Sequence, residues 1–459
     1  HRLAGALGVS WQRDDGYDLT PADAATTASS MDQRGLDGRL LFTGDHLRVD
    51  AGGDYLHRDQ RGIDGNAGGG VFDRRNLTET ASLYVRPAWQ TARTSDLRGM
   101  VRASLYRDQY ASDQRMSDAL DQYQDTRERL YEAAAHWEHR GARHTILLGA
   151  EVQDEALRSE RLRGGERDRQ RAGVFAQDEW VVSAWTLVPS ARIDADTQFG
   201  VHLTPRLAAR VDLAEDLVLR VAAGAGFRAP GFKELYLFFE NPGAGYVVEG
   251  NPELAPESST GMRASLAWSP RDDLWLDITG HRNDLSDMIV ATTTDHGAAG
   301  GPQRFSYQNL AEAHTQGLEA RARVLPWPQL VLEIGYALTL GEDESDGRAL
   351  EGRARHRGHA LVILRDGGRR FQVSVSATAV GARPYYSDRG GEGAGETAWT
   401  RPYLLAGARF AVGLTASLQL HASAENLVGA GDDDLTPLAP RSFFVGVSGH
   451  FASKGRNQP

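Results

Sequence analysis

The segment GFRAPGFKELYLFFENPGAGYVVEGNPELAPES, Gly226 to Ser258, decides which fold this sequence specifies. An alternating apolar and polar segment, Leu217 to Gly226, precedes it, and a second one, Ser259 to Trp268, follows it. The segment itself is long, aromatic and rich in proline and glycine, which is typical of an ordered surface loop rather than of a linker. The sequence therefore predicts a strand, a large structured loop and another strand.

The same alternation recurs along the whole chain. In Phe371 to Ala379 the odd positions are apolar and the even positions polar, and in Leu418 to Glu425 the even positions are apolar. In Phe443 to Phe451, Phe443, Val445, Val447 and Phe451 share one face. A period of two indicates β-strands with two unlike faces. No four-stranded repeat is visible, which disfavours a soluble propeller.

The connections between these strands alternate in length. Short turns are expected at sites such as Arg140 to Arg143, and long loops at 59–77, 109–125, 157–169 and 227–258. Short connections at one end and long ones at the other are typical of an antiparallel up-and-down transmembrane β-barrel. We predict an all-β chain of about twenty strands, with a barrel domain over 1–451 that ends on the aromatic Phe451 and a C-terminal tail over 452–459.

The composition excludes several classes of protein. The 459 residues contain no run of 18 apolar residues, which excludes an α-helical membrane span but not barrel strands. There is no cysteine for disulfides or thiolate metal sites, and a net charge of −11 argues against a nucleic-acid partner. The sequence starts at His1 without a signal peptide, so we expect a mature product or a fragment.

Two short motifs flank the central loop in order. They are FRAP (Phe227, Arg228, Ala229, Pro230) and NPEL (Asn251, Pro252, Glu253, Leu254). With this spacing around a strand, a loop and a strand, the chain resembles the TonB-dependent outer-membrane receptors of Gram-negative bacteria. HRNDLSDMI (281–289) and AENL (424–427) resemble the same family, and the layout looks nearest to its vitamin B12 and small siderophore receptors.

The resemblance implies a 22-stranded barrel whose chain crosses the outer membrane many times. Membrane lipid would surround this barrel, and an N-terminal plug domain would fill it. We expect that about 20 of a probable 22 strands are present here, and that the first two strands and the plug are absent. The implied function is high-affinity uptake of a scarce metal chelate, either cobalamin or a ferric siderophore. The energy would come from the TonB–ExbB–ExbD complex through a plug that is not in this chain.

Two other classes stay open from the residues alone. One is a passive outer-membrane porin without a plug. The other is an outer-membrane enzyme, but no GxSxG, paired-carboxylate or Ser-His-Asp arrangement stands out. We therefore predict no enzyme and no required cofactor.

Ligand contacts are expected in the central loop, where aromatic rings alternate with charges. Such mixtures bind organic metal chelates by stacking and hydrogen bonding. The candidates are Arg228, Lys233, Glu234, Tyr236, Phe238, Phe239, Glu240 and Tyr246. For Arg228, Pro230, Asn251 and Pro252 a role in setting the geometry of the loop is the favoured interpretation.

Metal sites are the last class of candidate. The vitamin B12 receptors bind calcium through loop aspartates, so the resemblance implies calcium at Asp18 in GYDL and, less closely, at Asp32 and Asp64. The pairs His136 with His139 and His356 with His359 stand three apart, so on a strand they face opposite ways and cannot share a metal.

Haem is also disfavoured. Haem receptors that resemble this loop carry a histidine between the two motifs, and none occurs here from Arg228 to Asn251, although His296 could substitute. The acidic runs Glu342 to Asp346 and Asp432 to Asp434 are interpreted as solvated loop charge.

Overall fold

The computed structural model describes residues 2–20, 22–65, 69–241, 245–295, 302–345, 347–368, 370–386, 397–415, 417–431, 435–436 and 438–449. This part of the chain is almost entirely β-structure. Its helices are one α-helix, α1 (Phe232–Tyr236), and one 3-10 helix, η1 (Asp118–Leu120). Among the described residues, no helix is both long enough and apolar enough to cross a membrane.

Twenty-five strands are found in the described residues. They are β1 (Arg2–Asp14), β2 (Ser30–Thr43), β3 (Leu47–Gly65), β4 (Val71–Ala92), β5 (Ser95–Gln114), β6 (Gln122–Arg140), β7 (His144–Ser159), β8 (Glu166–Val182), β9 (Trp185–Asp196), β10 (Gly200–Ala214), β11 (Leu217–Arg228), β12 (Phe238–Asn241), β13 (Tyr246–Glu249), β14 (Glu257–Arg271), β15 (Leu274–Asp295), β16 (Gln303–Trp327), β17 (Leu330–Asp343), β18 (Arg348–Ala349), β19 (His356–Arg365), β20 (Phe371–Val380), β21 (Pro384–Tyr386), β22 (Thr397–Trp399), β23 (Tyr403–Gly413), β24 (Leu418–Glu425) and β25 (Ser442–Gly449). Five of them, β12, β13, β18, β21 and β22, have only two to four residues and lie within longer connections. The others agree with the predicted number of about twenty.

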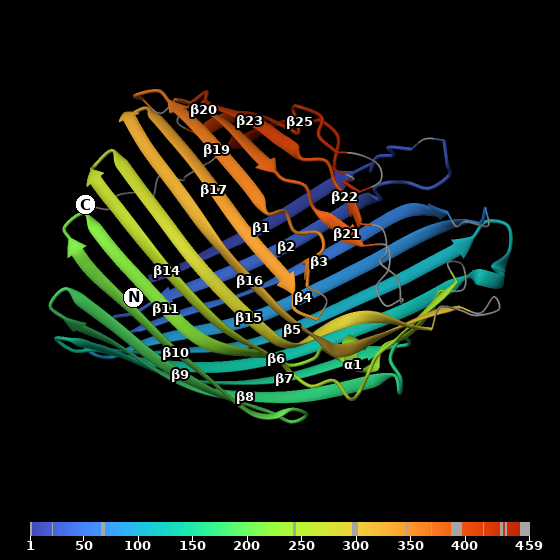
Figure 1. Ribbon diagram of the computed structural model, residues 1–459, viewed down its shortest axis with the longest axis horizontal. Helices are drawn as coiled ribbons and strands as arrows, with labels where there is room; N and C mark the ends of the chain where they lie inside the picture. The colour runs from blue at the N-terminus through green and yellow to red at the C-terminus, as the bar shows by residue number, and fades with distance from the viewer. Residues whose placement is uncertain are drawn as a thin grey trace. The chain divides into compact units, whose positions relative to one another are not determined.

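The chain divides into two compact units. Unit 1 comprises 1–208, 224–260 and 285–311. In it β1 to β9 follow one another as an antiparallel up-and-down meander, seen as neighbouring strands from blue to green in Figure 1. Every second connection is short, as predicted, for example between β6 and β7 and between β8 and β9.

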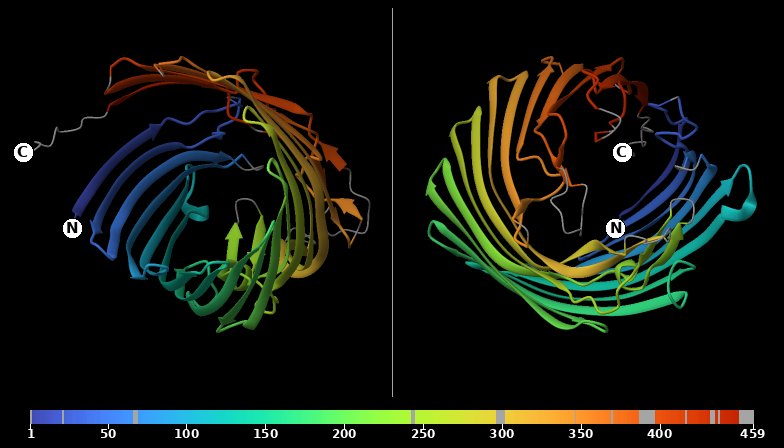
Figure 2. Two further views of the ribbon diagram at one scale, coloured as in Figure 1. Left: turned by 90° about the vertical axis from the view of Figure 1, so that its left-hand side faces the viewer. Right: turned by 45° about the vertical axis from the view of Figure 1, so that its right-hand side comes forward.

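Unit 2 comprises 209–223, 261–284 and 312–459. It contains a second antiparallel meander in which β17, β19, β20, β23, β24 and β25 pair in sequence order. A small ribbon of β21 and β22 follows β20 (Figure 2). Phe451 and the tail over 452–459 lie outside the described residues, so the expected aromatic end and the domain bounds stay predictions.

The strands reach further than the sequence predicted. Most of the expected loop 59–77 belongs to β3 and β4, and the expected loops 109–125 and 157–169 shrink in the same way. These loop bounds were wrong because the strand ends are highly charged. Their charges pair between neighbouring strands, as in Arg75–Asp59 at 2.9 Å and Arg107–Asp125 at 2.9 Å. A polar composition at these positions therefore does not indicate a loop.

The two faces of the β3–β8 sheet differ sharply. Residues directly opposite each other share a face, and one such row is Val85, Val101, Ala133, Val152 and Ala172. On this side large apolar residues are exposed, including Leu83 (69%) and Val101 (60%), and Trp89, Trp180 and Trp185 follow near the short turns. We call this the apolar face. A solvated sheet would not expose such a band, whereas a lipid-facing one requires it.

The opposite face is polar, with ion pairs such as Arg102–Glu132 at 3.7 Å. Several buried apolar side chains of unit 1 pack together at the loop of residues 226–258. Leu157, Leu162 and Phe232 form a cluster, with Tyr236 packed against it. A small core of this kind holds the loop in place and positions the candidate site.

Candidate ligand-binding site

Residues 226–258, here called the motif loop, connect β11 with β14 as predicted and are ordered by their own secondary structure. They contain α1 and the hairpin of β12 and β13, in which Phe238 lies opposite Glu249. β13 also pairs in parallel with the start of β16, with Tyr246 opposite Gln303. The motif loop is therefore anchored by backbone hydrogen bonds as well as by side chains.

Arg228 of the FRAP motif braces this loop. Its guanidinium donates to both carboxylate oxygens of Glu234 at 3.0 Å each, and it also donates to Glu257. Hydrogen bonds to these two carboxylates raise the pKa of Arg228. Glu234 in turn accepts the Gly231 backbone N–H at 2.6 Å and caps α1, while Glu257 accepts the Ile289 N–H at 2.6 Å.

The NPEL motif is fastened in a comparable way. The Asn251 side-chain amide donates to the Tyr307 carbonyl at 2.9 Å and accepts the Glu253 N–H at 3.0 Å. Its backbone N–H donates to the Glu234 carbonyl at 2.8 Å. Pro230 of the first motif is fully buried. The geometry fits the interpretation that the motif residues set the shape of the loop.

The tip of the β7–β8 hairpin packs against the motif loop. Gly164 and Gly165 take the positive φ angles of 84° and 75° that its turn requires. Leu162 forms a β-bridge with Leu237, the Arg163 N–H donates to the Tyr236 carbonyl at 2.9 Å, and the Phe238 N–H donates to the Arg161 carbonyl at 2.6 Å. Two segments far apart in the sequence thus share backbone hydrogen bonds.

Four arginines of this hairpin lie over aromatic rings of the motif loop, and we call them the arginine clamp: Arg161, Arg163, Arg167 and Arg169. The guanidinium carbon of Arg161 is 4.4 Å from the centre of the Phe239 ring. That of Arg167 is 4.5 Å from the Tyr236 ring. Arg163 lies 5.2 Å from Phe238, and Arg169 lies 5.0 Å from Phe232. These are cation–π distances.

The clamp was not predicted from the sequence, where 157–169 was expected to be a plain loop. The segment RSERLRGGERDR (158–169) nevertheless spaces its arginines on both sides of a Gly-Gly turn. That spacing, complementary to the aromatic spacing of the motif loop, is the signal that could have found it.

The clamp arginines differ in how their charge is balanced. Arg169 is only 4% exposed and donates to the Pro230 carbonyl at 2.8 Å, with the carboxylates of Glu155 at 3.5 Å and Asp196 at 3.8 Å. Arg163 pairs with Glu249 at 3.1 Å. Within the described ranges, neither Arg161 nor Arg167 forms an ion pair with a carboxylate. Burial lowers the pKa of Arg161, although the charge of Asp108 acts in the opposite direction.

The structure brings the predicted aromatic residues together but separates the predicted charges from them. Phe239, Tyr246 and Phe305 make successive edge-to-face contacts at 6.0 and 6.1 Å. The Tyr236 hydroxyl accepts a hydrogen bond from Gln198 at 2.7 Å. Lys233 and Glu240 are exposed, whereas Arg228 and Glu234 are committed to the brace. The clamp and these rings form the candidate site.

The three aspartates predicted as calcium ligands each have protein partners. Asp18 accepts the Thr20 N–H at 3.0 Å, Asp32 pairs with Arg34 at 3.0 Å, and Asp64 pairs with Arg74 at 3.1 Å. In the part of the chain that the structure describes, no three acidic or histidine side chains form a group that could hold a metal. Calcium at these residues stays a prediction.

The HxxH pairs lie as predicted, with each histidine in a separate environment. His139 hydrogen-bonds Ser95 at 2.8 Å while His136 contacts the Phe175 ring at 5.4 Å. His356 hydrogen-bonds the Tyr336 hydroxyl at 2.7 Å, and His359 lies 3.4 Å from Glu333. His296, the end of the run at Asp346 and the run 432–434 lie outside the described residues.

Residues 3–427 match the family model described as TonB dependent receptor-like, beta-barrel. Among curated proteins, the chain is 28% identical over 214 residues to the iron-regulated outer membrane virulence protein of Vibrio cholerae, covering 44% of this chain and 33% of that protein. It is 29% identical over 157 residues to the vitamin B12 transporter BtuB of Photobacterium profundum, covering 34% and 24%. The chain therefore spans a third or less of the length of these relatives.

Solved structures give a matching fold. The ferric enterobactin receptor of Pseudomonas aeruginosa superposes with a TM-score of 0.80 at 16% identity, covering 98% of this chain and 76% of that chain. The siderophore receptor PirA of Acinetobacter baumannii gives 0.80 at 13%, covering 98% and 75%. At such identities the likeness shows the fold alone, and it confirms the predicted antiparallel up-and-down β-barrel class.

Proposed function

Because the chain belongs to the TonB-dependent receptor-like β-barrel family, we propose that it forms the barrel of a receptor that captures and imports an anionic ferric chelate of the siderophore class. The family and its outer-membrane relatives confirm the predicted outer-membrane location, and they support a transport protein rather than an enzyme. What we propose is the class of solute and the source of the energy for its uptake.

The observation that carries the proposal is the arginine clamp over the motif loop. Arg161 and Arg167 lie over Phe239 and Tyr236, and neither forms an ion pair with a carboxylate in the described part of the chain. A guanidinium without a carboxylate keeps its charge available for a ligand anion, and the rings offer a stacking surface. Aromatic groups carrying negative oxygens fit this pairing better than a ligand of little net charge.

The names of the relatives support the same class of solute. One structurally similar protein is named as a ferric enterobactin receptor and another as a siderophore receptor, and one curated relative is named as iron-regulated. Another curated relative is named for vitamin B12, so cobalamin is the alternative that an experiment has to separate. Uptake would be driven by the TonB–ExbB–ExbD complex through a plug domain.

A binding measurement tests the proposal. Outer-membrane vesicles that contain the receptor in its native form are titrated with ferric enterobactin and, separately, with cyanocobalamin. We expect the double variant Arg161→Gln/Phe239→Ala to lose about 1–2 kcal/mol of affinity for the ferric chelate. Phe410→Ala, which removes a phenylalanine of unit 2 that is 41% exposed, serves as the matched control and should bind as the parent does.

Energy dependence separates an active receptor from a passive porin. If the proposal holds, a protonophore abolishes accumulation of the chelate by intact cells. Entry that continues unchanged with the protonophore would favour the porin, and tight binding of cyanocobalamin with none of the ferric chelate would shift the solute class to cobalamin.

A further inference from the structure

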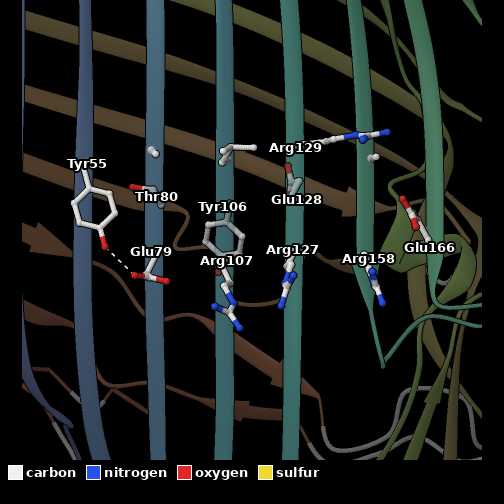
Figure 3. Close-up of a pocket in the computed structure, with 13 residues that line it drawn as sticks. Tyr55, Glu79, Thr80, Tyr106, Arg107, Arg127, Glu128, Arg129, Arg158 and Glu166 are labelled. Carbon is white, nitrogen blue, oxygen red and sulfur yellow. Dashed lines mark hydrogen bonds between the residues drawn. The ribbon is translucent and has the colours of Figure 1, made fainter.

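A row of charged residues crosses the apolar face of unit 1 near the long-loop ends of its strands. Glu79, Arg107, Arg127, Arg158 and Glu166 stand directly opposite one another on β4 to β8. Figure 3 shows the first four side by side on neighbouring strands. Three arginines thus occupy adjacent positions, and like charges directly opposite each other on a sheet are unfavourable unless something balances them.

The protein balances only part of this charge. Asp125 accepts hydrogen bonds from Arg107 at 2.9 Å and from Arg127 at 2.7 Å. Arg158 and its neighbour Arg129 are both exposed, and within the described ranges neither has an acidic partner. Glu166 lies opposite Arg158 in the ladder without pairing to it. Two cations therefore stay open to an anion from outside the chain.

These arginines rim a cavity of about 420 Å³ whose floor is apolar. Leu105, Ala81 and Ala156 lie on its wall together with Tyr55, whose hydroxyl donates to Glu79 at 2.8 Å. Arg129 stands one row nearer to the apolar residues, directly between Leu105 and Ala156. The cavity thus joins a cationic rim to an apolar surface.

The height of the row matches a membrane boundary. Below it the apolar face continues through Leu83, Val101 and Val152 to the row of Trp89, Leu97 and Trp137. Leu97 to Arg107 covers roughly the 9–11 residues that a tilted transmembrane strand needs. Because the long loops of such barrels are extracellular, the arginines lie where head groups of the outer leaflet lie.

We propose that this cavity binds the phosphorylated head group of an outer-leaflet glycolipid, with a phosphate on Arg129 and Arg158 and the acyl chains along the apolar face. Charge complementarity selects a phosphate, which arginine binds with paired hydrogen bonds. The apolar band that continues directly below the rim selects a lipid rather than a soluble phosphate. Glu79 and Glu166, at the two ends of the row, confine the anion to the middle strands.

Native mass spectrometry of the purified receptor in detergent tests this site with bisphosphorylated lipid A as the probe. We expect the parent to retain lipid A, and Arg129→Gln/Arg158→Gln to bind it roughly 25-fold more weakly. Arg129→Lys/Arg158→Lys, which keeps both charges, should regain most of the binding. Dephosphorylated lipid A should bind parent and double variant equally.

The matched control removes two positive charges from the other end of the same hairpins. Arg93→Gln/Arg143→Gln changes exposed residues of the short turns and should leave lipid A binding unchanged. A loss of the same size in this control, or full binding by Arg129→Gln/Arg158→Gln, overturns the proposal. Displacement of lipid A by millimolar inorganic phosphate would also overturn it, because it would show a phosphate site without a lipid. An unchanged shift between heated and unheated protein on a gel confirms that each variant is folded.

Discussion

Arg169 and Arg158 belong to the same β7–β8 hairpin, yet their surroundings have little in common. Arg169 is 4% exposed and contacts a carbonyl, two carboxylates and a ring of the motif loop. Arg158 is exposed on the apolar face and has no acidic partner within the described residues. The face of the sheet, more than the local sequence, therefore decides which contacts an arginine makes here. One face uses arginine to hold a loop, and the other leaves it free for an external anion.

The largest loss of stability is expected when the buried arginine, Arg169, is removed. Arg169→Ala leaves Asp196 buried without its cation, and breaking a buried pair in this way costs about 3–5 kcal/mol. Arg158→Ala should stay within about 0.5 kcal/mol because its side chain is exposed and unpaired. Urea unfolding of the two variants in lipid vesicles measures both. Equal stabilities for the two variants would contradict the assignment of the two faces.

A smaller effect is expected where the motif loop approaches its own helix. A Cβ on Gly250 would lie 2.5 Å from the Tyr236 backbone nitrogen, so Gly250→Ala must shift the loop relative to the clamp. Overpacking of this kind typically costs about 1–3 kcal/mol. In Gly38→Ala the new Cβ meets only Leu7 at 3.9 Å, so this control should unfold as the parent does. Faster proteolysis of the motif loop in Gly250→Ala alone would locate the change.

A double-mutant cycle measures whether an arginine of each face interacts with the Tyr236 ring. Removing Arg167 and Tyr236 singly and together should give a coupling of about 0.5–1 kcal/mol, since the guanidinium lies 4.5 Å from the ring. The same cycle with Arg158 in place of Arg167 should give no measurable coupling. A coupling of equal size in both cycles would mean that removing any positive charge affects Tyr236, and not specifically the contact with Arg167.

The smallest effect concerns pH. Hydrogen bonds from Arg107 and Arg127 lower the pKa of Asp125 to about 2 from its ordinary value of 3.8. A carboxyl whose pKa is lower in the folded state stabilises fully above its unfolded value, and this contribution is lost as pH falls through about 2. We therefore expect the parent to lose more stability between pH 5 and pH 2 than Asp125→Asn does, by urea titration. An identical loss in both would exclude Asp125 as a contributor.

The sequence was sufficient for the class of fold and for the bracing motifs. Strict alternation in segments such as Phe371 to Ala379 indicates a β-strand. Pro230 and Asn251 restrict the backbone locally. Both kinds of signal are local, so they can be interpreted without knowing which strands pair.

The clamp and the arginine row could not be predicted, because both depend on which distant segments come together. Contact between Arg161 and Phe239 requires a hairpin tip to meet a distant loop, and nothing within either segment specifies that meeting. The row of Arg107, Arg127 and Arg158 appears only once the register of three neighbouring strands is known. Charged strand ends were taken for loops because their pairing partners lie on neighbouring strands.

The two arginine sites are tested together when one set of preparations is assayed with both ligands. Parent, Arg161→Gln/Phe239→Ala and Arg129→Gln/Arg158→Gln are titrated with ferric enterobactin and with lipid A under the same conditions. We expect the first variant to lose only the ferric chelate and the second to lose only lipid A. Loss of both ligands by either variant, or of neither by both, would show that the two faces do not carry two separate arginine sites.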